Sequence, residues 1–168
     1  MLIQAAHNNT VMHIRPYRAA DRQRCLDIFD SNTPLYFAYE EHSQFCFWLD
    51  AHDQEKAAYE ESLAEHYYVI EEGGIVIGCG GFSIHQETGV AGMAWGMIDQ
   101  AQHRKGLGRA LFAHRLAQIK QLYPGSAVVL DTSQHSFPFF EKFGFKTVKI
   151  TEHGYGPGLH RYDMLLAE

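Results

Sequence analysis

Hydrophobic and polar residues follow one another in short periodic segments, and the period changes several times along the chain. Runs rich in β-branched and aromatic residues, bounded by turn residues, predict strands. They cover residues 11–15, 67–70, 75–84, 90–98, 127–131, 145–150 and 159–166. Apolar residues that recur every three or four positions predict helices. They cover residues 21–29, 36–49, 106–122 and 137–143.

The order of these segments predicts the fold class. The strands at 67–70, 75–84 and 90–98 are joined by turns, which indicates antiparallel pairing. The strand at 127–131 is reached from 90–98 through a helix, so these two strands should be parallel. We therefore expect an α/β fold with a mixed, mainly antiparallel sheet of six to seven strands and helices on both faces.

Local features refine this prediction. One stripe of the helix at 106–122 is apolar and should be buried; it consists of Leu111, Phe112, Leu116, Ile119 and Leu122. Glycines inside the strand at 75–84 predict a bulge or a close backbone approach. They are Gly78, Gly80 and Gly81. The polar segment 53–66 predicts a short helix or a loop, and 153–158 a glycine-rich loop.

The length of 168 residues suits one domain, which we place at 11–168 after a flexible leader at 1–10. No apolar run approaches the ~20 residues of a membrane span, and residues 1–10 do not resemble a secretory signal. The three cysteines are widely spaced and expected to be reduced. The 11 histidines lack metal-ligand spacing. We expect a cytoplasmic protein with no membrane partner and no metal.

Charge is unevenly distributed along the chain. The net charge of −6 argues against a nucleic-acid partner. Residues 100–130 nevertheless contain no acidic residue and carry Arg104, Lys105, Arg109, Arg115 and Lys120. A basic segment in an acidic protein indicates an anionic ligand, and a solvated helix face is the alternative.

Two glycines lie where the helix at 106–122 begins, within the segment HRKGLG at 103–108. Gly106 and Gly108 let the backbone turn tightly and approach a ligand. The first N–H groups of a helix have no partner within the helix, and together with its dipole they bind anions. The segment therefore predicts a pyrophosphate site.

Two familiar pyrophosphate loops fit this segment poorly. A Walker loop places a lysine and a serine or threonine after its last glycine, but Gly108 precedes Arg109 and Ala110. A dinucleotide-binding loop needs a third glycine where Leu111 stands, although Asp131 lies near the position of its ribose-binding acid. A nucleotide-binding module stays an alternative.

Two segments resemble the motifs of one enzyme family. Residues 95–99 (WGMID) and 103–111 (HRKGLGRAL) resemble motif A of the GNAT N-acetyltransferase superfamily, and 139–145 (FFEKFGF) resembles its later motif. The order of predicted elements matches as well. The resemblance implies an acetyl-CoA-dependent enzyme that acetylates a primary amine of a small molecule or peptide. Family members are often dimers, so a homodimer is among the expected partners.

The chain departs from the family pattern at two positions. His103 stands where Gln or Arg is preferred, but main-chain N–H groups should still bind the phosphates. Phe140 stands where many members carry the tyrosine that protonates the departing thiolate. Since phenylalanine has no proton to donate, a non-catalytic acyl-CoA-binding or regulatory module is the alternative function.

The resemblance implies cofactor contacts along the strand end, the loop, the first helical turn and the later short helix. These residues are Met97, Ile98, Asp99, His103, Arg104, Lys105, Gly106, Leu107, Gly108, Arg109, Ala110, Ser133, Ser136 and Phe139. A main-chain N–H near Met97 would hold the thioester carbonyl oxygen, a contact worth ~3 kcal/mol during reaction. Ser136 is also expected to cap the short helix.

The acceptor amine, with a pKa near ~10, needs a base to remove its proton. Asp99 is the candidate base, and Tyr155, His160 or Tyr162 is expected to replace the missing acid. Residues of the second helix and the preceding break are expected to bind the acceptor, together with Trp95. They are Asn32, Tyr36, Glu40 and Glu41. The two glutamates favour a cationic acceptor.

Overall fold

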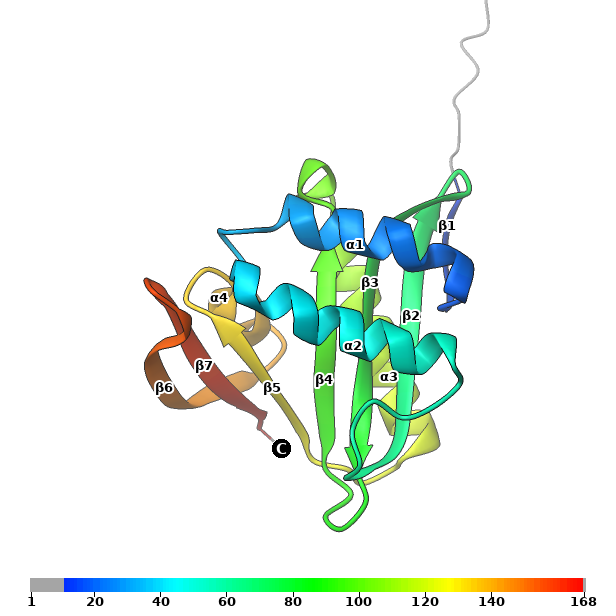
Figure 1. The fold of residues 1–168 in the computed structure, drawn as a ribbon. Coiled ribbons are helices and arrows are strands. Elements are labelled where there is room, and N and C mark those ends of the chain that lie inside the picture. The colour runs from blue at the N-terminus through cyan, green and yellow to red at the C-terminus, as the bar shows by residue number, and fades with distance from the viewer. Residues whose placement is uncertain (1–10, 168) are drawn as a thin grey trace, which may run out of the picture.

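The computed structural model describes residues 11–167, in which four helices pack on a seven-stranded sheet (Figure 1). The strands are β1 (Met12–Pro16), β2 (Ser62–Glu72), β3 (Ile75–His85), β4 (Ala91–Ile98), β5 (Val128–Ser133), β6 (Phe145–Gly156) and β7 (Leu159–Leu166). The helices are α1 (Arg22–Ser31), α2 (His42–Asp53), α3 (Leu107–Leu122) and α4 (Phe137–Glu141). The predicted leader at 1–10 lies outside the described residues.

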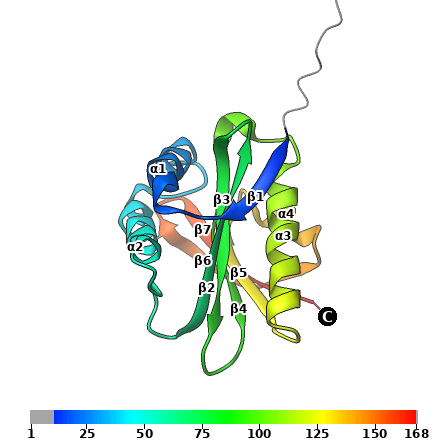
Figure 2. The same cartoon turned by 90° about the vertical axis from the view of Figure 1, so that its right-hand side faces the viewer.

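The strand order is β1-β2-β3-β4-β5-β7-β6. Only β4 and β5 pair in parallel, as the intervening helix α3 requires. Helices α1 and α2 cover one face of the sheet, and α3 and α4 cover the other (Figure 2). The predicted fold class is therefore confirmed. No helix of the described part is long and apolar enough to cross a membrane.

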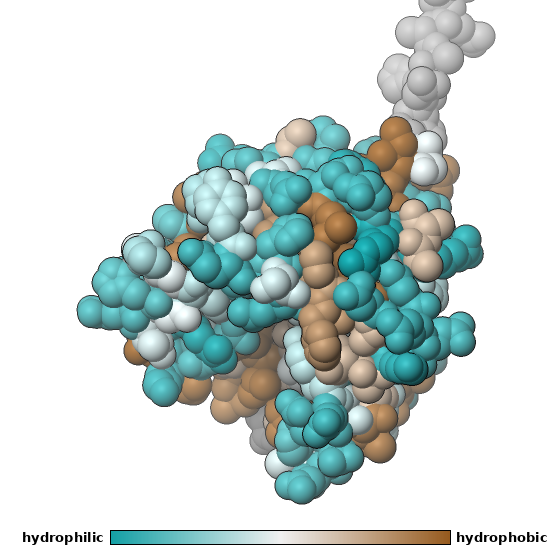
Figure 3. All heavy atoms as spheres, in the orientation of Figure 1, coloured by the Kyte–Doolittle hydropathy of each residue, from teal (hydrophilic) through white to brown (hydrophobic). Residues whose placement is uncertain are grey.

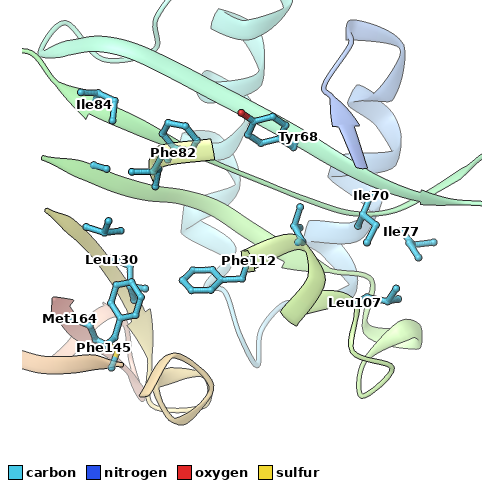
Figure 4. Close-up of a cluster of buried hydrophobic side chains, with 14 residues drawn as sticks. Tyr68, Ile70, Ile77, Phe82, Ile84, Leu107, Phe112, Leu130, Phe145 and Met164 are labelled. Carbon is cyan, nitrogen blue, oxygen red and sulfur yellow. The ribbon is translucent and has the colours of Figure 1, made fainter. Parts of the chain in front are cut away.

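Strand β2 places apolar side chains on both faces of the sheet. Tyr67 and Val69 are buried in the cluster under α1 and α2, whereas Tyr68 and Ile70 belong to the cluster under α3 (Figure 4). Successive side chains of a strand point to opposite faces, so a strand covered on both sides must be apolar throughout. The two clusters hold the sheet rigidly between its helix layers.

The buried stripe of α3 differs from the prediction at two positions. Leu111, Phe112 and Ile119 are buried, but Leu122 is 46% exposed at the last residue of the helix. Arg115 occupies a buried place between them and is only 4% exposed. Three- and four-residue spacing puts position 115 on this stripe, so reading Arg115 as part of a solvated or ligand-facing basic segment was wrong.

Three other element boundaries in the structure differ from the predicted ones. Strand β2 begins at Ser62 instead of Tyr67, and the carboxylate of Glu65 orders the preceding loop by accepting the N–H groups of Ala58 and Tyr59. Helix α2 begins at His42 instead of residue 36. Strand β6 continues to Gly156, so most of the predicted loop at 153–158 is strand.

Candidate active site

Strands β4 and β5 separate after a short paired stretch. Ala91 pairs with Val128 and Gly92 with Val129, and beyond these pairs the strands diverge toward their carboxyl ends (Figure 1). Parallel strands that diverge leave their facing backbone groups without ladder partners, and we call this divergence the β4–β5 opening. This opening lies next to the amino-terminal end of α3.

A β-bulge bends β4 beside the opening. The register passes from Gly81↔Ala94 to Cys79↔Met97, so Trp95 and Gly96 oppose a single residue of β3. Trp95 takes a φ of +47°, in the left-handed region. The glycines of β3 thus mark a bulge, as predicted, although the extra residue belongs to β4. A Cβ on Gly81 would lie 1.9 Å from the His66 carbonyl oxygen, so the predicted close backbone approach is present too.

The amino terminus of α3 has the geometry expected of an anion site. Gly106 is the N-cap with a φ of +76°, and no side chain hydrogen-bonds to this end of the helix. A Cβ on Gly106 would meet nothing within 4 Å. A Cβ on Gly108 would lie 3.7 Å from Ile98 and 3.8 Å from Phe139, which puts these residues around the same exposed backbone. The first-turn N–H groups are therefore accessible to a pyrophosphate.

The loop before α3 is tied to the end of β4. The Ile98 carbonyl oxygen accepts from Asn32 Nδ2 at 2.8 Å and lies 2.9 Å from His103 Nε2. A carbonyl only accepts, so His103 Nε2 carries its proton. Tyr36 packs edge-on against His103, with 5.3 Å between the ring centroids. Asn32 and Tyr36, predicted to contact the acceptor, thus lie against this loop, and the amide of Asn32 is bound to main chain.

Asp99, the predicted base, has structural partners. Its carboxylate pairs with Arg24 and accepts the N–H of Ala101 at 3.0 Å, as the N-cap of the 3₁₀ turn Gln100–Gln102. These contacts hold the carboxylate of Asp99 in place at the strand end. Its predicted role as a base stays a prediction.

A second carboxylate, Glu41, is more deeply buried on the α2 side of the sheet. Its side chain accepts the Ala38 N–H at 2.8 Å and so closes the 3₁₀ turn Tyr39–Glu41 that precedes α2, and the residue is 8% exposed. Burial, together with the negative charge of Asp131, raises the pKa of Glu41 to about 7. Glu40 is exposed, and its carboxylate borders Gly156 of the β6–β7 hairpin. The charge of Glu40 also raises the pKa of Glu41 and the charge of Arg161 lowers it, so Glu41 has charges of both signs nearby.

Asp131 connects β5 to the β6–β7 hairpin. It accepts the hydroxyl hydrogen of Tyr155, and Arg161 Nη2 lies 3.6 Å from it and 2.9 Å from Asp163. Burial, followed by the charge of Asp131, raises the pKa of Tyr155. A raised pKa makes the phenol hold its proton more tightly, which disfavours Tyr155 as the acid.

The other two predicted acids have contacts of their own. Tyr162 packs against the α3-side cluster and stacks on Phe137, with 4.4 Å between the ring centroids. The His160 N–H donates to Gln134 Oε1 at 2.8 Å, and its ring Nδ1 accepts the His153 N–H at 3.0 Å.

The comparisons with known proteins now identify the family. The model of the acetyltransferase (GNAT) domain matches residues 37–167. The chain belongs to the GNAT acetyltransferase family. No curated protein matches the chain by sequence.

Solved GNAT structures share the whole fold. A GNAT-family protein from Desulfovibrio desulfuricans is 21% identical, with 93% of this chain and 98% of that chain covered and a TM-score of 0.72. YncA from Salmonella typhimurium, solved with its cofactor acetyl-CoA, is 19% identical over 95% and 96% of the two chains, with a TM-score of 0.69. The ribosomal-protein-S18-alanine N-acetyltransferase from Escherichia coli is 14% identical over 94% and 96%, with a TM-score of 0.70.

Phe140 stands at the position of the GNAT tyrosine, and its ring makes aromatic contacts there. Phe140 packs against Phe112 at 5.0 Å between ring centroids, within the α3–α4 layer, and Phe139 packs beside it. Ser133 is buried, and its hydroxyl accepts the His135 N–H at 3.3 Å. Ser136 is the N-cap of α4, but its side chain makes no capping bond, so that part of the prediction was wrong.

Trp95, predicted to contact the acceptor, packs among aromatic side chains of the cluster under α1 and α2. It stacks with Phe37 at 6.2 Å and lies 5.2 Å from Phe45, between ring centroids. Figure 3 shows this face as largely hydrophilic, with hydrophobic side chains in a hollow below α2 that Tyr59, Gly92 and Val129 help to line. The hollow borders the paired ends of β4 and β5 and so lies away from the carboxyl ends, where the two strands diverge.

Sequence reasoning missed two residues whose side chains donate hydrogen bonds to main-chain carbonyls of β4. Tyr67 donates its hydroxyl hydrogen to the Trp95 carbonyl at 2.8 Å, and Arg115 donates to the Ala94 carbonyl at 3.2 Å. Helical spacing could have placed Arg115 in the core, but nothing in the sequence shows which carbonyls it meets. For Tyr67 no sequence signal was available.

Proposed function

We propose that this protein is an acetyl-CoA-dependent N-acetyltransferase that acetylates a primary amine of a cationic small molecule or peptide. The observation that carries the proposal is the uncapped amino terminus of α3 beside the opening between β4 and β5. YncA, which shares the fold, was solved with acetyl-CoA, and another relative is an alanine N-acetyltransferase. A cytoplasmic location and a homodimer stay predictions.

The chain's own groups suit the cofactor. Acetyl-CoA, when bound, supplies the acetyl group as a thioester. Main-chain N–H groups at Gly106 and Gly108 would bind the pyrophosphate, and the exposed Arg104 and Lys105 would add positive charge. The main chain at Met97 would face the thioester.

Glu41 suits the task of binding and deprotonating an amine. Its carboxylate and that of Asp131 attract an ammonium group to the α2 side of the opening. A base works best when its pKa lies near the working pH, and Glu41, at about 7, meets that condition. Glu41 would therefore accept the ammonium proton before the amine attacks.

Phe140 favours the alternative of a non-catalytic acyl-CoA-binding module, because its ring supplies no proton. The structure also shows Tyr155 bonded to Asp131 with a raised pKa. In the enzymatic proposal the departing thiolate takes its proton from solvent. Transfer would then not require a tyrosine at position 140.

Release of free thiol from acetyl-CoA, measured with a broad panel of amines, tests the proposal. We expect turnover with cationic primary amines and a kcat/KM that rises through pH 7, as Glu41 loses its proton. Acidic amines should react poorly. Tight CoA binding without turnover on any amine would support the non-catalytic module instead. Thermal stabilisation by NAD or ATP but not by CoA would contradict both.

A further inference from the structure

Arg115 is a buried cation whose partners are main-chain carbonyls. Its Nε and Nη2 donate to the Gly81 carbonyl oxygen at 3.0 and 2.6 Å, and Nη2 also donates to that of Ala94 at 3.2 Å. Among the described residues no carboxylate forms an ion pair with it. Removing a cation from water costs several kcal/mol without a counter-charge, so an arginine on an otherwise apolar stripe needs an explanation.

The two carbonyls lie at the start of the bulge in β4. Gly81 and Ala94 are register partners, and the next pair, Cys79 and Met97, follows only after the extra residue. A bulge leaves main-chain groups without their ladder partners. Arg115 supplies donors at this point, so its guanidinium replaces the hydrogen bonds that the bulge removes.

Glycines on both strands make room for the guanidinium. A Cβ on Gly96 would lie 2.4 Å from Arg115 Nη1, and a Cβ on Gly80 would lie 3.1 Å from Arg115 Cζ. Gly96 is itself exposed, at the side of β4 that diverges from β5. The positive charge therefore lies directly behind the backbone that borders the opening.

The same bulge is held from the opposite face. Tyr67 donates to the Trp95 carbonyl at 2.8 Å, while Arg115 comes from the α3 side. Together they fix two successive carbonyls of β4 and thereby the orientation of the following peptide groups. A backbone held in an uncommon conformation from two sides is typical of a functional site.

We propose that Arg115 is a positioning residue for acetyl transfer, which holds the β4 bulge so that the main chain at Met97 meets the thioester carbonyl oxygen. The inference rests on the proposed function, since it assigns the opening to the thioester. The buried charge acts in the same direction, because a nearby cation in a low-dielectric site favours electron density on that oxygen. Burial lowers the pKa of Arg115 to about 10, so the charge is present at neutral pH.

The test is the infrared stretch of the thioester carbonyl in bound, ¹³C-labelled acetyl-CoA, which requires no acceptor amine. We expect the wild-type protein to lower this frequency relative to free acetyl-CoA, and Arg115→Met to lose at least half of the shift. Arg115→Lys, which keeps the charge but not the forked donors, should retain an intermediate shift. The Kd of both variants for CoA should stay within about threefold of the wild-type value, because the α3 amino terminus binds the phosphates independently of Arg115.

Gly96→Ala provides a second variant if Arg115→Met does not fold, since the added methyl displaces the guanidinium while all donors remain. Gly92→Ala is its control in the same strand, because its Cβ would come no closer than 3.6 Å to Ser83 Oγ. We expect loss of the shift in Gly96→Ala and its retention in Gly92→Ala. A full shift in a folded Arg115→Met or Gly96→Ala protein would overturn the proposal.

Turnover separates this inference from the proposed function. With an amine that reacts, Arg115→Met should lower kcat about tenfold to a hundredfold and leave the KM for acetyl-CoA within about threefold. An unchanged kcat would overturn the positioning role while leaving the acetyltransferase proposal intact. If no amine reacts with the wild-type protein, the proposed function fails, and the infrared shift still decides whether Arg115 shapes the site.

Discussion

At the residue scale, the raised pKa of Glu41 lowers the stability of the folded protein but suits its proposed role as a base. Its pKa rises from 4.5 to about 7 in the folded protein, so the native state binds a proton more tightly than the unfolded chain does. Stability from this residue is therefore greatest below about pH 4.5 and is lost as the pH rises toward 7. A glutamine could accept the same Ala38 N–H without bearing a charge.

Replacement of Glu41 by Gln should therefore stabilise the protein and inactivate it. We expect the free energy of unfolding to rise by about 1 to 3 kcal/mol at pH 8 and by much less at pH 4.5, as measured by urea denaturation. The kcat/KM for the amine should fall at least about a hundredfold. Glu40→Gln, at the exposed neighbouring position, serves as the control. Wild-type turnover in Glu41→Gln would exclude Glu41 as the base.

Position 81 requires glycine because a Cβ there would clash with the backbone of the neighbouring strand. A Cβ there would come within 1.9 Å of the His66 carbonyl oxygen in the paired strand, which cannot move without breaking the sheet. We expect Gly81→Ala to lower the free energy of unfolding by about 3 kcal/mol. Gly92→Ala should change it by less than about 1 kcal/mol. Equal losses in the two variants would show that the close approach is absent in solution.

At the element scale, the β6–β7 hairpin is braced by the segment between β5 and α4. Gln134 Nε2 donates to the Gly158 carbonyl at 2.7 Å, and Gln134 Oε1 accepts the His160 N–H at 2.8 Å. The hairpin carries Tyr155, whose hydroxyl reaches Asp131 on β5. Gln134 therefore helps to fix the hairpin that would form one wall of the proposed acceptor site.

Loss of this brace should loosen the hairpin locally. We expect Gln134→Ala to speed hydrogen exchange at the His160 amide and to cost only about 1 kcal/mol of stability. The KM for the amine should rise severalfold, while the Kd for CoA should stay unchanged. Gln121→Ala, on the exposed side of α3, is the matched control. Unchanged exchange at His160 would show that Gln134 does not hold the hairpin.

Elements with strong periodicity were predicted closely, and those set by side-chain contacts were not. Strand β7 and helix α3 have bounds within one residue of the prediction, because each begins next to a glycine and α3 is followed by Pro124. Helix α2 follows a 3₁₀ turn that the bond between Glu41 and Ala38 closes, and β2 follows a loop held by Glu65. Such bonds form through particular geometry that periodicity does not encode.

At the scale of the whole molecule, the sequence predicted the layers and the glycine-marked loop before α3 but not the full sheet order. Placing β7 between β5 and β6 requires non-local pairing that no local pattern specifies. The loop was predictable because its glycines and helix start are contiguous. Glu41, Asp131 and Arg115 come from separate elements, and only the fold shows which partners each of them meets.

The central claim is that coenzyme A lies in the opening between β4 and β5 with its pyrophosphate at α3. A crystal structure of the protein with CoA tests it most directly. We predict pyrophosphate oxygens within hydrogen-bond distance of the N–H groups at Gly106 and Gly108, and the sulfur beside Gly96. Pyrophosphate bound elsewhere on the molecule, or a CoA thiol that lies outside the β4–β5 opening, would contradict the account.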